Sequence, residues 1–215
     1  RETPTHTAII RALHLQPHVD GGYFVETDRD SLRVPTPWHA PSHPHSHAMG
    51  WAPYDTRSAM SSMQFYLTPK APVAYFHRDR ARTIHTLHKG RGRFVILHAD
   101  EATVPPPPGG PGAPHHHHHH HPHHGWLGTA RVETFDVGPD VAAGERSQWV
   151  VGGGKYTACF LLPDKAGKAA SKEGLLVSET VVPGFEYCDH DLLADDRLAA
   201  LVTPAQRLEL AWLVR

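Results

Sequence analysis

The chain has 215 residues, of which 40% are hydrophobic and 20% are charged, a composition typical of a globular protein. Its 21 Lys and Arg nearly balance its 22 Asp and Glu, which argues against a dedicated nucleic-acid-binding protein. No apolar run approaches the roughly 20 residues that a membrane-spanning helix needs. We therefore expect a cytoplasmic protein that acts without a nucleic-acid or membrane partner.

The chain begins with a predicted helix over Thr5–Leu15, followed by a short strand at Tyr23–Glu26. The next segment, residues 28–58, is rich in Pro, Ser and His, and we predict that it has little regular structure. Dense β-signals begin after it. The predicted strands are Met63–Leu67, Val73–His77, Thr83–His88, Phe94–His98, Arg131–Val137, Trp149–Val151, Tyr156–Leu162 and Leu175–Val182.

Histidine is unusually frequent, with 21 residues, and nine of them lie between positions 115 and 124, behind a Pro- and Gly-rich run. Such a composition cannot bury enough apolar surface to offset its ordering entropy. We predict a mobile low-complexity loop at residues 101–125, inserted between two strands and without a catalytic role.

The end of the chain is predicted to be helical over Asp195–Leu201 and Ala205–Val214, with Thr203 and Pro204 starting the second helix. Many short strands separated by turn residues, with helices at both ends, favour an antiparallel barrel or sandwich. The predicted fold class is therefore all-β with flanking helices.

Four sequence motifs occur in a familiar order. They are PHVDGGYFVET at residues 17–27, RSAMSSMQFYL at 57–67 leading to Phe76-His77-Arg78, GERSQ at 144–148, and VPGFEY at 182–187. Together they resemble the cupin_5 family (formerly DUF985) of the RmlC-like cupin superfamily. The resemblance implies a double-stranded β-helix, or cupin jelly-roll barrel, formed by a single domain over residues 1–215. It also implies a central cavity and a homodimer.

The chain departs from the family pattern at two places that matter for chemistry. Thr83 stands where the family usually has a Glu, and Tyr156 stands where it tends to have a Trp. Any mechanism that depends on that Glu would not operate here, and the cavity would have a different shape.

Alternation within strands helps to select candidate site residues, because residues two apart share a face. Thr83 and His85 therefore point the same way, and the resemblance places His85 inward. Glu179 lies within an apolar strand, where an ionisable side chain needs solvent, a partner or a cavity. The candidate ligand-binding residues are Tyr66, His77, Thr83, His85, Gln148, Tyr156 and Glu179, and we expect them around one cavity of a few hundred Å³.

These residues favour binding of a small polar organic molecule such as a sugar, a sugar nucleotide or a nucleobase. One version is a metal-independent epimerase or isomerase, in which His77 or His85 acts as base and Tyr156 or Tyr66 as acid. The alternative is a non-catalytic binding or storage protein.

A second alternative is a metal-dependent oxygenase, in which His77 and His85 bind a metal together with Glu179 or Glu26. The spacing GxxxxxHxHxxxxE that is usual in metal-dependent cupins is absent from the sequence. We therefore expect no metal and no other cofactor.

Overall fold

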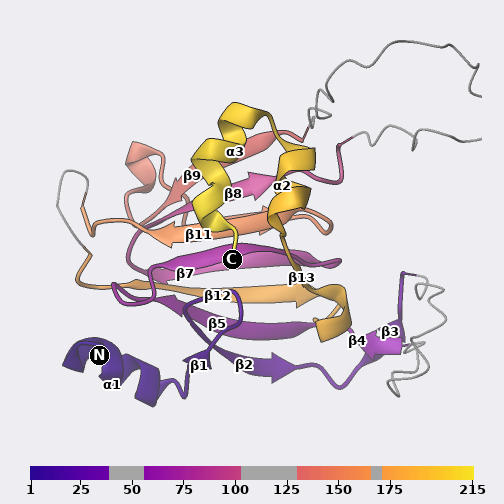
Figure 1. The fold of residues 1–215 in the computed structure, drawn as a ribbon. Coiled ribbons are helices and arrows are strands. Elements are labelled where there is room, and N and C mark those ends of the chain that lie inside the picture. The colour runs from indigo at the N-terminus through magenta and orange to yellow at the C-terminus, as the bar shows by residue number, and fades with distance from the viewer. Residues whose placement is uncertain (39–55, 103–129, 166–170) are drawn as a thin grey trace, which may run out of the picture.

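The computed structural model describes residues 1–38, 56–102, 130–165 and 171–215. Two antiparallel sheets make up most of it, with short helices near both termini (Figure 1). This is the all-β fold with flanking helices that the sequence predicts. No helix in these residues is long and apolar enough to cross a membrane.

The larger sheet has six strands in the order β1-β2-β5-β12-β7-β10. Their bounds are β1 Gln16–Pro17, β2 Tyr23–Arg29, β5 Ser61–Leu67, β12 Leu175–Val182, β7 Arg82–Lys89 and β10 Gln148–Val151. The second sheet has five strands in the order β13-β6-β11-β8-β9. Their bounds are β13 Asp191–Leu192, β6 Val73–Arg78, β11 Tyr156–Leu161, β8 Gly92–Leu97 and β9 Val132–Val137.

The helices are short. They are α1 Pro4–Ala12, α2 Asp195–Leu201 and α3 Pro204–Leu210, with 3-10 turns η1 Val141–Ala143, η2 Tyr187–Asp189 and η3 Ala211–Leu213. Thr203 and Gln206 form a capping box at the start of α3, with Pro204 in its first turn, as the sequence predicts.

The prediction that residues 28–58 have little regular structure is wrong at both ends of that segment. Strand β2 continues to Arg29, and strands β3 (Arg33–Pro35) and β4 (Thr56–Ser58) pair antiparallel. The Arg33 guanidinium holds this pair together, because it donates hydrogen bonds to the backbone oxygen of Thr56 and to Ser58. Residues 39–55 and the predicted loop from residue 103 onward lie outside the described residues.

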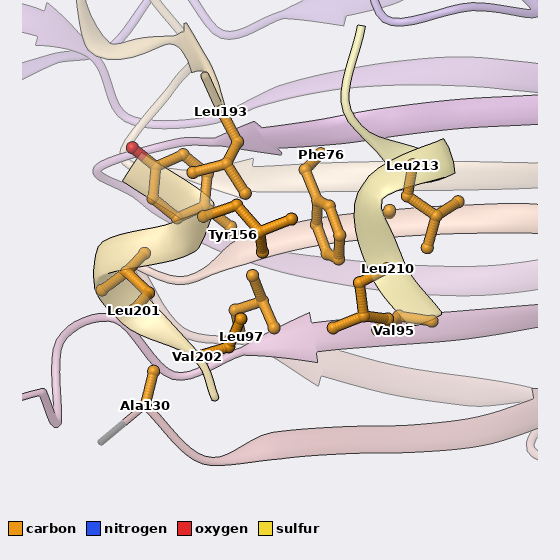
Figure 2. Close-up of a cluster of buried hydrophobic side chains, with 12 residues drawn as sticks. Phe76, Val95, Leu97, Ala130, Tyr156, Leu193, Leu201, Val202, Leu210 and Leu213 are labelled. Carbon is orange, nitrogen blue, oxygen red and sulfur yellow. The ribbon is translucent and has the colours of Figure 1, made fainter. Parts of the chain in front are cut away.

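Two buried clusters lie on opposite faces of the five-stranded sheet. The inner cluster fills the space between the two sheets and includes Phe65, Phe94 and Trp149. The outer cluster joins β6, β8 and β11 to the C-terminal helices, with Phe76 and Leu97 among its members (Figure 2). Because both faces of this sheet are buried, both sets of alternating side chains on its strands are largely apolar.

A β-bulge in β6 directs His77 into the space between the sheets. Ala74 pairs with Cys159 and His77 pairs with Thr157, so two residues of β6 stand opposite the single residue between those partners on β11. One of the two, Tyr75, donates its backbone N–H to the backbone oxygen of Asp20 at 2.7 Å. The bulge therefore both turns His77 inward and holds the loop before β2 against β6.

Gly21, in that loop, is a position that does not accept a side chain. Its φ is +107°, and a Cβ there would lie 2.2 Å from the backbone oxygen of Val73. We expect Gly21→Ala to lower the free energy of unfolding by about 3 kcal/mol, from backbone strain plus this clash. Gly144→Ala is the matched control, because Gly144 has φ +93° but nothing within 4 Å of its Cβ position.

The Gly144→Ala control should lose only about 1 kcal/mol, the cost of the left-handed conformation alone. Urea unfolding of both variants measures the difference. Equal losses would show that the contact with Val73 is not what requires glycine at position 21.

Candidate functional site

A row of side chains crosses the inner face of the six-stranded sheet at one level. Strand pairing sets Glu26 opposite Met63, Met63 opposite Glu179, and Glu179 opposite His85, with Trp149 as the next partner of His85. His85 stacks on Trp149, with ring centroids 5.1 Å apart and planes 9° apart. The row therefore brings an imidazole and a carboxylate into the interior between the sheets.

Asp20 gathers three imidazoles from distant parts of the chain. Its Oδ2 lies 3.1 Å from Nδ1 of His18, 3.4 Å from Nδ1 of His77 and 3.1 Å from Nε2 of His190. His77 and His190 also stack, with centroids 5.6 Å apart. This cluster fixes the orientation of the His77 ring, because its Nδ1 also lies 3.0 Å from the backbone oxygen of Tyr75.

The charges in this cluster stabilise one another. Burial alone would raise the pKa of Asp20, but the charge of His77 and the hydrogen bonds from His18 and His190 hold it well below its usual range. Burial alone would lower the pKa of His77, yet the carboxylates of Asp20 and Asp79 raise it above its usual value. Asp20 is therefore ionised at neutral pH, and His77 holds its proton more tightly than a free imidazole does.

For the other two buried groups, His85 and Glu179, burial favours the neutral form. Burial, helped by the positive charge of His77, lowers the pKa of His85 to about 3, so its imidazole is neutral. Burial, with the nearby carboxylates of Asp79 and Asp20, raises the pKa of Glu179 to about 7, against the effect of His77. The shortest approach between His85 and Glu179 is 3.7 Å, from Nε2 to Oε1. Glu179 is therefore the group that changes its charge near neutral pH.

Three adjoining cavities occupy this interior, and His77 and Glu179 line all of them. The largest has a volume of about 80 Å³, and each of the other two about 20 Å³. The largest is also lined by Asp20, Asp79, His18 and His190, with aromatic residues toward its rim. Together they are smaller than the few hundred Å³ that the sequence led us to expect.

The structure brings together four of the seven predicted site residues. His77 and Glu179 line all three cavities, His85 lines the two smaller ones, and Thr83 lines one of these. Tyr66, Gln148 and Tyr156 line none of the three, which corrects the expectation that they face the cavity.

Each of those three side chains points elsewhere for a clear reason. Gln148 is exposed and donates a hydrogen bond to Thr86 on the outer face, because its neighbour Trp149 faces inward. Tyr156 belongs to the outer cluster beneath the C-terminal helices, where its hydroxyl lies 3.3 Å from Asp191 (Figure 2). The hydroxyl of Tyr66 lies 2.6 Å from Nδ1 of His6 and donates to the backbone oxygen of Glu173.

Four residues of the site were not selected from the sequence: His18, Asp20, Asp79 and His190. His18 and Asp20 lie in the first motif, directly before its two glycines, and that position was the available signal. Asp79 lies two residues after His77, just past the end of β6, a spacing that keeps both on one side of the strand. For His190 there was no local signal, since its contact with Asp20 spans 170 residues.

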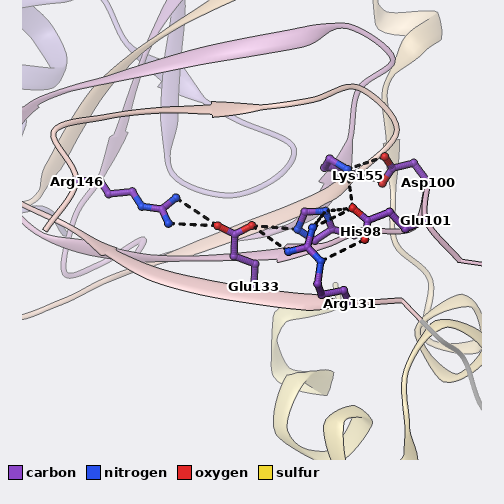
Figure 3. Close-up of polar contacts among 7 residues, drawn as sticks. All are labelled: His98, Asp100, Glu101, Arg131, Glu133, Arg146 and Lys155. Carbon is purple, nitrogen blue, oxygen red and sulfur yellow. Dashed lines mark hydrogen bonds and ion pairs between the residues drawn. The ribbon is translucent and has the colours of Figure 1, made fainter. Parts of the chain in front are cut away.

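Outside the three cavities, the charged side chains of one groove and one cluster are paired with one another. An open groove of about 840 Å³ lies beside β8 and β9, but its arginines are paired, Arg93 with Asp136 and Arg91 with Glu145. In the described residues one group brings three metal-ligand atoms within 4.8 Å of one another: His98, Asp100 and Glu101. Lys155 and Arg131 already bind these carboxylates (Figure 3). The described residues that line the three cavities do not bring three such atoms within that spacing.

The family model described as "Cupin superfamily (DUF985)" matches residues 7–193. The chain belongs to this family. The resemblance seen in the four sequence motifs is thereby confirmed. This cupin is 34% identical over 208 residues to the uncharacterized protein YML079W of Saccharomyces cerevisiae, covering 95% of this chain and 84% of the relative.

Two solved structures share the fold of this cupin. A hypothetical protein from Leishmania major superposes with a TM-score of 0.65 at 23% identity, covering 96% of each chain. Protein SO0799 from Shewanella oneidensis superposes with a TM-score of 0.62 at 23% identity, covering 97% of this chain and 96% of the other. At this level of identity the likeness establishes the fold alone.

Proposed function

We propose that this cupin binds a small polar organic molecule in the cavity between its sheets and transfers protons on it, with His77 and Glu179 as the acid–base pair. One observation carries the proposal: the same two side chains line all three adjoining cavities. A ligand that occupies any of them therefore meets both groups. The cavity volume suits a molecule of a few non-hydrogen atoms, or the reacting end of a larger one.

The two groups are suited to opposite roles. Glu179, whose pKa is raised to about 7 by burial, is available near neutral pH both as a carboxylate base and as a neutral acid. The carboxylates of Asp20 and Asp79 raise the pKa of His77, which favours it as the proton donor, and Asp20 also holds its ring in place. In an isomerisation Glu179 takes a proton from a carbon of the ligand, and His77 donates a proton to the adjacent carbonyl oxygen. Glu179 then gives a proton to the former carbonyl carbon, and His77 takes a proton from the hydroxyl group on the carbon that was first deprotonated. Both groups return to their starting protonation states, so no further reactant is consumed.

His85 serves a different purpose in this proposal. Its neutral ring is fixed between Trp149 and the edge of Phe94, and its Nδ1 is buried without a hydrogen-bond partner among the described residues. A fixed neutral imidazole orients a ligand rather than transferring a proton. Tyr66 and Tyr156 lie outside the cavities, so we assign to His77 the acid role expected for one of them.

A thermal-shift screen of small hydroxy-carbonyl compounds, polyols, amines and carboxylates tests binding. A ligand at about 100 times its Kd stabilises the folded state by about 2.7 kcal/mol, so the melting temperature should rise by about 5 °C or more. His77→Gln should abolish this shift. Tyr156→Phe is the control: it removes only the hydrogen bond to Asp191, and the shift should persist.

Incubating a verified ligand with the protein in D2O separates catalysis from binding. Deuterium appearing on a ligand carbon with wild type, and not with Glu179→Gln, would support proton transfer. Binding without exchange would leave the alternative, a non-catalytic binding protein. No shift with any compound would contradict ligand binding at this cavity.

A further inference from the structure

The largest of the three adjoining cavities has an unusual set of lining residues. Its described lining contains the carboxylates of Asp20, Glu26, Asp79 and Glu179 but no lysine or arginine. Its outer part is aromatic. Building on the proposed function, we infer that the ligand of this cavity is a small organic cation, with an ammonium group held between the carboxylates and the aromatic rim.

The inner wall offers acceptors that lack donors. Asp20 is only 2% exposed, and its Oδ1 has no hydrogen-bond partner in the described part of the chain. Oδ1 of Asp79 is likewise buried without a partner among those residues. A buried carboxylate oxygen left unpaired is costly, and an ammonium group supplies N–H donors and the opposite charge together. A cationic donor would therefore pair with these two carboxylate oxygens of the inner wall.

The rim offers faces that attract cations. The rings of Phe185 and Tyr187 stand nearly perpendicular, with centroids 5.1 Å apart and planes at 78°. Phe24 lines the same cavity from β2, and its ring centroid lies 4.3 Å from that of His18, with the two planes at 71°. Tyr187 is 63% exposed, so it marks the entrance. Aromatic faces around one opening bind ammonium groups through their negative quadrupoles.

The positively charged side chains of the protein do not pair with all of the cavity carboxylates. Protonated His77 is matched by Asp20, which His18 and His190 also contact, and Glu26 is paired with Arg29. His85 is neutral. Asp79 and Glu179 remain without a cationic side chain of their own, and a bound cation would compensate them. Binding should therefore promote ionisation of Glu179 and release a proton.

The cavity volume limits the size of the cation. A water molecule needs about 10–15 Å³ of such space, so about 80 Å³ holds roughly five to eight non-hydrogen atoms. Choline and ethanolammonium fall within or just below that range. The alcohol 3,3-dimethylbutan-1-ol has the shape of choline without its charge, which makes it the matched neutral probe.

Isothermal titration calorimetry of the full chain with these three probes at pH 6 and pH 8 tests the inference. We expect choline or ethanolammonium to bind at least tenfold more tightly than the neutral alcohol. Affinity for the cation should rise several-fold from pH 6 to pH 8, with proton release. Glu179→Gln should weaken cation binding at least tenfold at pH 8 and remove its pH dependence, while affinity for the neutral alcohol stays the same.

Two further variants make the result specific. Tyr187→Leu removes an exposed ring without opening the core, and it should weaken cation binding about threefold or more. Glu209→Gln removes one negative charge from the exposed face of α3 and should leave the affinity for the cation unchanged.

If the neutral alcohol binds as tightly as choline, the cation inference is wrong. If neither cation binds while a neutral or anionic compound gives a shift that needs His77, the inference fails and the proposed function stands. If no compound binds in either experiment, both fail.

Discussion

Replacing Glu179 with Gln is expected to stabilise the protein at pH 8 by about 3 kcal/mol. Burial raises the pKa of Glu179 from 4.5 to about 7, and a shift of that size corresponds to that free energy. The raised pKa means that the folded state holds the proton more tightly than the unfolded state. Stability that is present below pH 4.5 is therefore lost as pH rises toward 7, and stays lost above it. Gln is neutral throughout and avoids this loss.

The pH dependence separates this explanation from a change in packing. At pH 4 the wild-type carboxyl is protonated in the folded state, so Glu179→Gln should then be nearly neutral in effect. Urea unfolding at pH 4 and pH 8 measures both values. A loss of stability at both pH values would show that Glu179 makes a structural contact that Gln cannot replace. A gain at pH 8 together with lost ligand binding would mean that the wild type sacrifices stability to keep a carboxylate inside the cavity.

Replacing Asp20 with Asn should have the opposite sign and a comparable size, a loss of about 3–5 kcal/mol near pH 5.5. The substitution leaves the buried positive charge of His77 without its partner. The lowered pKa of Asp20 means that its stabilising charge is present above pH 3.8 and is lost as pH falls below that value. The raised pKa of His77 means that its contribution is present below pH 6.5 and is lost as pH rises through its folded pKa.

The loss caused by Asp20→Asn should therefore be greatest between about pH 4 and pH 6.5 and should shrink at higher pH, where His77 is neutral in the wild type as well. Unfolding measured across this range, with the His77 titration followed by NMR, checks both parts. Asp28→Asn, at an exposed position on β2, is the control and should stay within about 0.5 kcal/mol of wild type. A loss that did not change with pH would point to the backbone loop rather than to the charges.

Much of the barrel could be predicted from alternation and turn residues, and the site only in part. His85 and Thr83 share a face of β7, whereas the apolar residues around Glu179 left solvent, a partner or a cavity as its possible surroundings. The same rule should have placed Gln148 outside, since Trp149 is the buried neighbour in β10. Tyr156 was different, because the five-stranded sheet is covered on both sides, and its strands show no polar face that would give a direction.

The remaining site features depend on contacts that no local pattern contains. The bulge that turns His77 inward adds one residue to β6, and simple alternation from Ala74 would have pointed His77 the other way. Asp20 was visible only as part of a motif before two glycines. Its partners arrive from β6 and from the segment before β13, which sequence spacing cannot bring together.

The carboxylate of Asp20 has a consequence for the time order of folding. It joins residue 18 near the beginning of the chain, residue 77, and residue 190 near the end. Contacts of such sequence separation form slowly, because long segments must first be closed into loops. In a refolding experiment, burial of Trp149 in the inner cluster will report early collapse, whereas the raised pKa of His77 will be acquired only once the segment around residue 20 has docked. The titration of His77 therefore reports when its long-range contact with Asp20 has formed.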